Sequence, residues 1–261
     1  MPRGTNTKII AICNQKGGVG KTTTAVNVAA FLAASEIPTL IVDMDPQANC
    51  TSGLGIEIGS YDHSVYDVII GKSKLMKCLQ TTELEYLDVL PASAQLVGAE
   101  IELVGLLTRE NMLKDAISDN EVIDKYDYII IDSPPSLGLL TINVLTASNS
   151  IIIPIQCEYY ALEGLSQLLN TIRLVQKKLN PNLRIEGILT TMYDNRLNLS
   201  RQVVKELKEY FGDKVYQTTI CRNVRLAESP SHGKPILLYD ASSTGAQNYM
   251  NLVSEILALN E

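Results

Sequence analysis

Short apolar runs alternate along the chain with longer stretches in which apolar residues recur at helical spacing. Runs of four to eight apolar residues are typical of buried parallel strands, and spacings of three and four are typical of helices. The pattern predicts six strands, at residues 8–13, 39–43, 87–91, 128–132, 150–154 and 184–190. It predicts helices at residues 23–35, 94–118, 138–147, 161–179, 199–211 and 244–258.

Strands that alternate with helices in this way predict an α/β fold: a doubly wound, mainly parallel sheet flanked by helices. A chain of 261 residues can bury one large core, so we expect a single domain over residues 1–261. Its hydrophobic content of 46% and charged content of 20% are ordinary for a soluble globular protein. The longest apolar runs are too short to span a bilayer.

The N-terminal residues MPRGTNTK lack the apolar stretch of a signal peptide, so we expect a cytoplasmic protein. The five cysteines are scattered and show no C-x-x-C spacing. Reduced thiols are therefore expected rather than disulfides or a cysteine metal site.

The stretch NQKGGVGKTTT, at residues 14–24, lies between the first predicted strand and the first predicted helix. Strand, glycine-rich turn and helix form the context of a phosphate loop, whose N–H groups and helix N-terminus bind an anion. We expect Lys21 to reach the β- and γ-phosphates and the Thr22 hydroxyl to coordinate Mg²⁺. Two residues depart from the general pattern: Gln15 stands where that pattern has glycine, and Lys16 is an additional lysine.

Three carboxylates follow predicted strands, at Asp43, Asp45 and Asp132. Ligands of doubly wound folds bind beyond the carboxyl ends of the strands. Asp132 stands where a carboxylate is needed to hold Mg²⁺ beside a phosphate loop. Of the other two, one could support the metal and the other orient an attacking water, although both could instead shape the turn before Pro46.

Several of these motifs resemble a known family. KGGVGKTT, DMDPQAN and YDYIIIDSPPS are similar to the deviant Walker-A P-loop ATPases of the ParA/MinD group. The segments PIQCEYYALEGL (154–165), TMYDNR (191–196) and CRNVRLAESPSHGKPILLYD (221–240) resemble the ParA branch, the Soj-like partitioning proteins. The resemblance covers nearly the whole chain.

The resemblance implies a role for the additional lysine. Lys16 corresponds to the signature lysine, which reaches phosphates bound by the other subunit, so that ATP is sandwiched in a homodimer. It implies catalytic roles for Lys16, Lys21 and Asp45, with Asp45 positioning the water. It also implies Mg²⁺ binding near Thr22, Asp43 and Asp132. Residues 45–52 and 133–138 would form the loops that sense the γ-phosphate. Implied ATP contacts are Lys16, Gly17, Gly18, Val19, Gly20, Lys21, Thr22, Thr23, Met192, Arg222 and Asn223.

The implied function is ATP-dependent DNA segregation. The Mg-ATP dimer would bind DNA without sequence preference, in association with the nucleoid, and a ParB-like centromere-binding protein would stimulate slow hydrolysis and release. Arg196 and Arg225 match DNA-binding arginines of the family. The net charge of −7 opposes DNA binding, although residues 184–234 carry nine Lys/Arg against six Asp/Glu. Two departures concern Cys221, where the family commonly has proline, and residues 240–244, where many relatives carry basic residues.

Other classes are less well supported. A MinD-like membrane ATPase would need a basic amphipathic C-terminal helix, and the tail YMNLVSEILALNE has no Lys or Arg. An electron carrier or metal-cluster chaperone would need grouped cysteines. A nucleotide switch that acts through a protein or membrane partner without binding DNA stays open, as does a relative that binds nucleotide without hydrolysing it.

Overall fold

The computed structural model describes residues 7–158 and 163–260. Within this part of the chain, one sheet has the strand order β3-β4-β2-β5-β1-β6-β7-β8, and every pairing is parallel except that of β3 with β4. This confirms the predicted doubly wound, mainly parallel fold. The strands are β1 (Lys8–Ile12), β2 (Thr39–Asp43), β3 (Gln80–Thr81), β4 (Leu87–Leu90), β5 (Tyr128–Asp132), β6 (Ser150–Gln156), β7 (Arg184–Tyr193) and β8 (Val215–Cys221).

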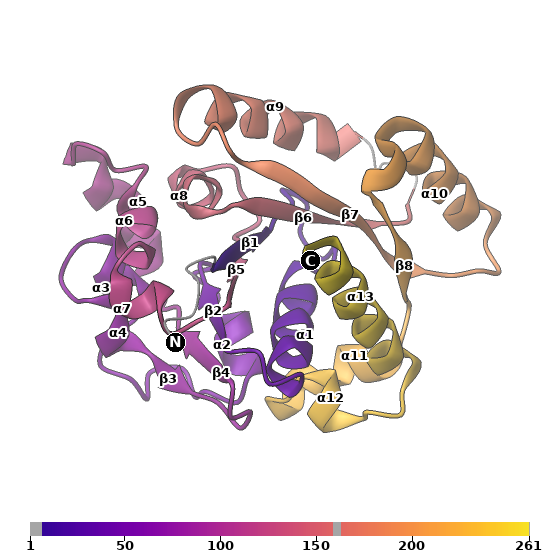
Figure 1. Cartoon of the computed structure of the whole chain (residues 1–261), viewed down its shortest axis with the longest axis horizontal. Coiled ribbons are helices and arrows are strands. Elements are labelled where there is room, and N and C mark those ends of the chain that lie inside the picture. The colour runs from indigo at the N-terminus through magenta and orange to yellow at the C-terminus, as the bar shows by residue number, and fades with distance from the viewer. Residues whose placement is uncertain (1–6, 159–162, 261) are drawn as a thin grey trace.

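Helices cover both faces of the sheet (Figure 1). One face carries α1 (Lys21–Ala34), α2 (Asn49–Gly53), α11 (Val224–Glu228), α12 (Ile236–Tyr239) and α13 (Thr244–Asn260). The other carries α3 (Val65–Ile69), α4 (Leu75–Cys78), α5 (Leu96–Glu102), α6 (Met112–Ile117), α7 (Asn120–Ile123), α8 (Leu139–Ala147), α9 (Glu163–Lys178) and α10 (Asn198–Phe211). Three 3₁₀ turns complete the order: η1 (Leu103–Gly105), η2 (Gly212–Lys214) and η3 (Ser229–His232).

The apolar strands are buried because helices cover both faces. Every residue of β2 and β5 is buried, which explains why these segments read as continuous apolar runs rather than alternating ones. Helix α1 is buried almost all round, since it lies between the sheet and α13. Its alanines permit that close approach, and the Thr24 and Tyr249 hydroxyls lie 3.2 Å apart across the contact.

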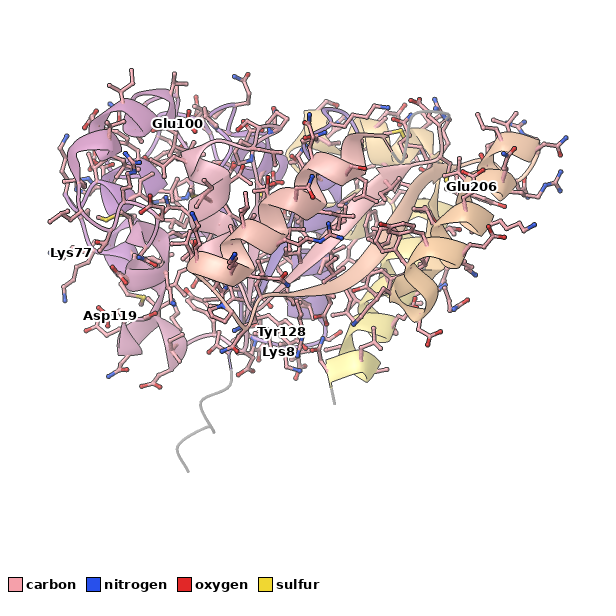
Figure 2. All side chains as sticks on the ribbon, turned by 90° about the horizontal axis from the view of Figure 1, so that it is seen from above. Lys8, Lys77, Glu100, Asp119, Tyr128 and Glu206 are labelled. Carbon is pink, nitrogen blue, oxygen red and sulfur yellow. The ribbon has the colours of Figure 1, made fainter. Side chains whose placement is uncertain are left out.

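The register of the central strands brings three chain segments to one level at the carboxyl edge. Asp132 of β5 pairs with Ile12 of β1 on one side and with Asp43 of β2 on the other. The phosphate loop therefore leaves β1 beside two carboxylates. In Figure 2, Lys8 and Tyr128, which begin β1 and β5, lie at the lower edge, and Glu100 lies at the opposite edge. The Glu100 carboxylate approaches the Leu140 N–H group at 3.5 Å, just past the residue 133–138 loop.

The structure differs from the expected elements in two respects. The single helix expected at residues 94–118 is broken into α5, η1 and α6, because the chain turns after Gly105 and Thr108 adopts a left-handed φ of 64°. Strands β3 and β8 were not predicted, and neither were the short helices α2, α3, α4, α7, α11 and α12. Residues 161–162 of the helix expected at 161–179 lie outside the described residues.

Among the described helices, none combines the length and the apolar character that crossing a membrane requires.

Replacement of Gly187 by alanine tests the packing of the sheet. A Cβ on Gly187 would lie 2.3 Å from Cε2 of Tyr216, whose ring is buried. We expect Gly187→Ala to lower the free energy of unfolding by about 1–3 kcal/mol, because the ring must move in a filled core. Denaturant titration measures this. Gly105→Ala is the control, since no atom lies within 4 Å of its added Cβ; equal losses in the two variants would contradict the packing argument.

Candidate nucleotide-binding site

The phosphate loop turns between β1 and α1 around open space. Gly18 and Gly20 have φ values of 73° and 88°, a conformation that side chains other than glycine rarely adopt. A Cβ on Gly17 or Gly18 would meet no atom of the described residues within 4 Å, so these residues leave the concave side of the loop unfilled. Gly20 caps α1 without any side-chain hydrogen bond to the first turn. The first N–H groups of the helix therefore face a region suited to an anion.

The two lysines of the loop have different surroundings. Lys21 is buried, and its Nζ donates to the Lys16 carbonyl oxygen at 3.2 Å. Burial lowers the pKa of Lys21, although attraction to Asp132 opposes this. The Lys16 ammonium instead lies 2.9 Å from Oε2 of Glu158 in an ion pair whose side chains are 41% and 50% exposed. Lys21 therefore lies in the cavity, and the Lys16 ammonium lies at the surface.

Asp132 is a buried carboxylate with an incomplete set of partners. Its Oδ2 accepts a hydrogen bond from the Thr22 hydroxyl at 2.7 Å, whereas its Oδ1 has no partner among the described residues. Burial, followed by repulsion from Asp43, raises the pKa of Asp132 well above its usual value. An unpartnered buried carboxylate oxygen beside a hydroxyl fits Mg²⁺, which binds few protein ligands and keeps waters and phosphate oxygens. In the described part of the chain, no cluster of three or more His, Cys, Asp or Glu side chains is arranged to bind a metal by itself.

Asp43 is enclosed by protein donors. Its Oδ1 accepts from the Asp45 N–H at 3.1 Å, and its Oδ2 accepts from the Thr51 N–H at 2.8 Å and the Thr51 hydroxyl at 2.7 Å. Burial raises the pKa of Asp43 to about 6, and the Thr51 hydrogen bonds oppose the shift. Like Asp132, Asp43 is absent from the cavity lining. It holds the residue 45–52 loop in place, and its expected part in metal binding stays a prediction.

Asp45 faces the cavity and is 8% exposed. Its Oδ1 accepts from the Gln47 N–H at 3.0 Å, which orients the carboxylate. The following Ala48 has a left-handed φ of 52° and caps α2. Pro135 of the residue 133–138 loop lines the same cavity. Both loops expected to sense the γ-phosphate therefore border one space.

Two cavities meet at the start of α1. The first has a volume of about 620 Å³ and the second about 350 Å³, and Gly20, Thr23, Met192 and Pro230 line both. The first also contains these other predicted residues: Gly17, Gly18, Lys21, Thr22 and Asp45. The second contains the predicted residues Arg222 and Asn223. A ligand with a charged end and a planar, less polar end fits this shape, with the charged end at the glycines.

Comparisons with known proteins place the chain in a family. A family model described as an AAA domain matches residues 7–185. The sporulation initiation inhibitor protein Soj of Bacillus subtilis is 61% identical over 96% of this chain and 98% of that protein. The chromosome partitioning protein ParA of Myxococcus xanthus is 54% identical over 96% of this chain and 88% of that protein. The chain belongs to the ParA/Soj family of partitioning ATPases.

A solved structure of similar fold carries a nucleotide. Cobyrinic acid a,c-diamide synthase from Mycobacterium smegmatis, with bound ADP and magnesium, is 36% identical to this ParA/Soj ATPase. The TM-score is 0.83, and the match covers 97% of this chain and 94% of that one. The match extends over the whole sheet and its helices, beyond the phosphate loop alone.

The two arginines expected to bind DNA in this ParA/Soj ATPase lie outside both cavities and are already paired. Arg196 donates to both oxygens of Asp194, at 2.9 and 2.7 Å. Arg225 lies 3.0 Å from Glu228 and 3.5 Å from Asp240. Asp240 begins the segment in which many relatives were expected to carry basic residues. These contacts lower the positive charge that each arginine presents.

Sequence reasoning missed several residues that line the first cavity. Lys234 lies there and forms a 3.4 Å ion pair with Glu83. A lysine in a loop carries no local signal of ligand binding. Lys234 follows η3, and only the fold brings this segment beside α1 and α2. The other missed polar residues in the lining are Asn27, Ser229 and Ser231, whereas Gln47, Asn49 and Ser52 belong to the loop predicted at residues 45–52.

The buried charge of Asp132 predicts a pH dependence of stability without metal. Because its folded pKa lies above the unfolded value, the folded state holds a proton that the unfolded state releases. The free energy of unfolding therefore falls as pH rises from about 4. We expect Asp132→Asn to raise it by about 1–3 kcal/mol at pH 8 in EDTA, and by less at pH 5.

Denaturant titration at the two pH values checks this expectation. Asp127→Asn is the control, because Asp127 is an exposed carboxylate at the start of the same strand. A loss of stability in Asp132→Asn at pH 8 would show that the buried carboxylate stabilises the metal-free fold.

Proposed function

We propose that this ParA/Soj ATPase is a DNA segregation switch. Mg-ATP drives formation of a homodimer that binds DNA without sequence preference, and hydrolysis stimulated by a ParB-like protein releases it. The observation that carries the proposal is the different positions of the two lysines of the phosphate loop. Lys21 lies inside the cavity, whereas the Lys16 ammonium lies at the surface, from which it can reach a second subunit.

In this proposal, ATP would occupy both cavities. The phosphates would lie against the N–H groups of residues 17–23, and the adenine would lie near Met192, Arg222 and Asn223. Thr22 and Asp132 would hold Mg²⁺, with Asp43 behind them supporting the loop. Mg²⁺, when bound, would neutralise charge on the phosphate oxygens. The nucleotide and magnesium bound to the M. smegmatis protein support this arrangement.

Hydrolysis would depend on charge stabilisation and on positioning of the water. Lys21 from the same subunit and Lys16 from the partner subunit would stabilise charge on the transferring phosphoryl group. The Asp45 carboxylate, oriented by the Gln47 N–H group, would position the attacking water. No histidine lines the cavity to serve as a strong base, which suits a slow reaction that a partner accelerates.

Dimer formation would follow the charge of the nucleotide. The phosphates bring several negative charges to the rim of the cavity, and a lysine from each partner subunit is attracted only while they are present. Loss of the γ-phosphate removes part of this attraction and would relax the loops at residues 45–52 and 133–138. The state of the nucleotide would thereby control assembly.

DNA binding would rest on phosphate contacts shared between two subunits. Arg196 and Arg225 would supply these contacts, and a dimer doubles their number without any reading of bases. A cytoplasmic protein that binds DNA only in this form would be associated with the nucleoid only when ATP is bound.

A second candidate is a switch that acts through a protein or membrane partner without DNA. The ion pairs of Arg196 and Arg225 and the net charge of −7 favour it. A membrane partner is less favoured than a protein partner, because helix α13 contains no Lys or Arg.

Duplex DNA binding measured with no nucleotide, ADP, ATP and a slowly hydrolysed ATP analogue separates the two candidates. We expect binding only with ATP or the analogue, weakening steeply with salt. Arg196→Ala combined with Arg225→Ala should lower the affinity for DNA at least tenfold. Lys16→Ala should abolish the ATP-dependent binding of DNA. Asp45→Ala should bind ATP, hydrolyse it poorly and stay on DNA.

Arg173→Ala is the matched control, because Arg173 is an exposed arginine on α9, outside the basic segment 184–234. A wild-type protein that dimerises on ATP and ignores DNA at low salt would favour the second candidate.

The ion pair of Lys16 with Glu158 predicts an effect on assembly. Lys16 must leave Glu158 to reach a partner subunit, so the pair opposes dimer formation. We expect Glu158→Gln to lower the ATP concentration for half-maximal dimer formation about twofold to fivefold, the effect of an exposed ion pair. Sedimentation velocity over an ATP titration measures it.

Glu209→Gln removes another exposed acid, which pairs with Lys205 on α10, and serves as the control. A higher ATP requirement in Glu158→Gln than in the control would refute the competing role of this ion pair.

A further inference from the structure

Asn14 is a buried amide at the point where the chain leaves β1. The last main-chain bond between β1 and β6 joins the Cys13 N–H to the Ile152 oxygen at 3.0 Å. Two residues further along β6, the Pro154 oxygen accepts from the Asn14 side chain, Nδ2, at 2.7 Å. Parallel strands advance two residues from one such bond to the next. The Asn14 amide therefore supplies the next bond of the ladder from a side chain.

The other end of the same amide holds the phosphate loop. Asn14 Oδ1 accepts from the Lys16 N–H at 3.0 Å, a local turn that asparagine favours. The Lys16 carbonyl oxygen accepts in turn from Lys21 Nζ at 3.2 Å. Both polar groups of the Lys16 main chain are thus engaged, one by Asn14 and one by the second lysine.

The end of β6 supports Lys16 in two ways. Pro154 holds its main chain through Asn14, and Glu158, four residues later, pairs with its ammonium. The side-chain contact is exposed and exchangeable, whereas the amide contact is buried. Only an amide of this size offers a donor and an acceptor to these two partners at once. Alanine offers neither, and serine is too short to reach both.

We propose that Asn14 is a positioning residue that directs Lys16 toward the second subunit by fixing the Lys16 main chain to the end of β6. The inference rests on the proposed nucleotide-gated dimer and deepens it. Without the amide, the Lys16 main chain can move relative to β6. The point from which its side chain extends is then no longer fixed. Nucleotide binding within one subunit depends on Lys21 and the glycines and should suffer less.

A double-mutant cycle tests the inference with dimer formation as the readout. Sedimentation velocity over an ATP titration would be run for wild type, Asn14→Ala, Lys16→Ala and the double variant, with binding of a fluorescent ATP analogue measured alongside. We expect Asn14→Ala to raise the ATP requirement for dimer formation at least tenfold and to weaken analogue binding by less. In the Lys16→Ala background, Asn14→Ala should add no further loss.

Asn180→Ala is the matched control at the opposite end of β6. The Asn180 side chain donates to the carbonyl oxygens of Leu145, Thr146 and Ser148, which precede that strand. It should lower thermal stability without changing the ATP requirement. Asn14→Ser, whose hydroxyl can accept from the Lys16 N–H group, should recover part of the dimer formation and serves if Asn14→Ala does not fold.

The outcomes separate the inference from the proposed function. Losses that add in the double variant, or wild-type dimer formation by Asn14→Ala while Lys16→Ala fails, would overturn the positioning role alone. Wild-type dimer formation by Lys16→Ala would overturn the proposed dimer and the inference with it. Loss in Asn14→Ala with no added loss in the double variant supports both.

Discussion

The buried carboxylate of Asp132 is the constraint on which the rest of the site depends. It stands level with Asp43 at the end of the central strands, and one of its oxygens has no partner in the described part of the chain. A buried charge of this kind destabilises the fold unless a cation approaches it. The fold tolerates it because β5, which carries Asp132, and the adjoining β2 are wholly buried and mostly apolar, and contribute to a large core. In the proposed complex, this charge would attract a cation and, through it, the phosphates.

The two lysines of the phosphate loop lie in different places: Lys21 lies inside the subunit and the Lys16 ammonium lies at its surface. The Lys21 side chain is buried, is attracted to Asp132 and lines the cavity. Lys16 is held by its main chain at the end of β6 and by its side chain at Glu158, so its position depends on another strand. A single P-loop subunit needs only the first lysine. The proposed dimer would also need Lys16, at a surface position from which its ammonium can leave Glu158.

Acidic side chains also reduce the positive charge of the two arginines proposed to bind DNA. Arg196 and Arg225 form ion pairs with acids from their own segments, including Asp240 beyond α12. Exposed pairs of this kind are weak, and a phosphate backbone with its released counterions can replace the carboxylates. Several such contacts are needed before binding becomes firm. This property suits an assembly that binds DNA as a dimer and leaves it as a monomer.

Local sequence was enough for most of the long elements and for the glycine turn between β1 and α1. The runs at 39–43 and 128–132 are strands because only burial on both faces accommodates such sequences, and the glycines at 18 and 20 occupy the left-handed conformations that the loop requires. Strand β8 was missed, as was the short strand β3, because each is defined by its pairing with another strand.

Tertiary structure alone decided the partners of the charged groups. Sequence placed Asp43 at the end of a strand, but only the fold brought Thr51 to enclose its carboxylate. Sequence identified Lys16 as unusual, but only the pairing of β1 with β6 brought Pro154 and Glu158 to hold it. The physical reason is range: backbone conformation and apolar periodicity act over a few residues, whereas hydrogen bonds and ion pairs act across whatever the folded chain brings within about 3 Å.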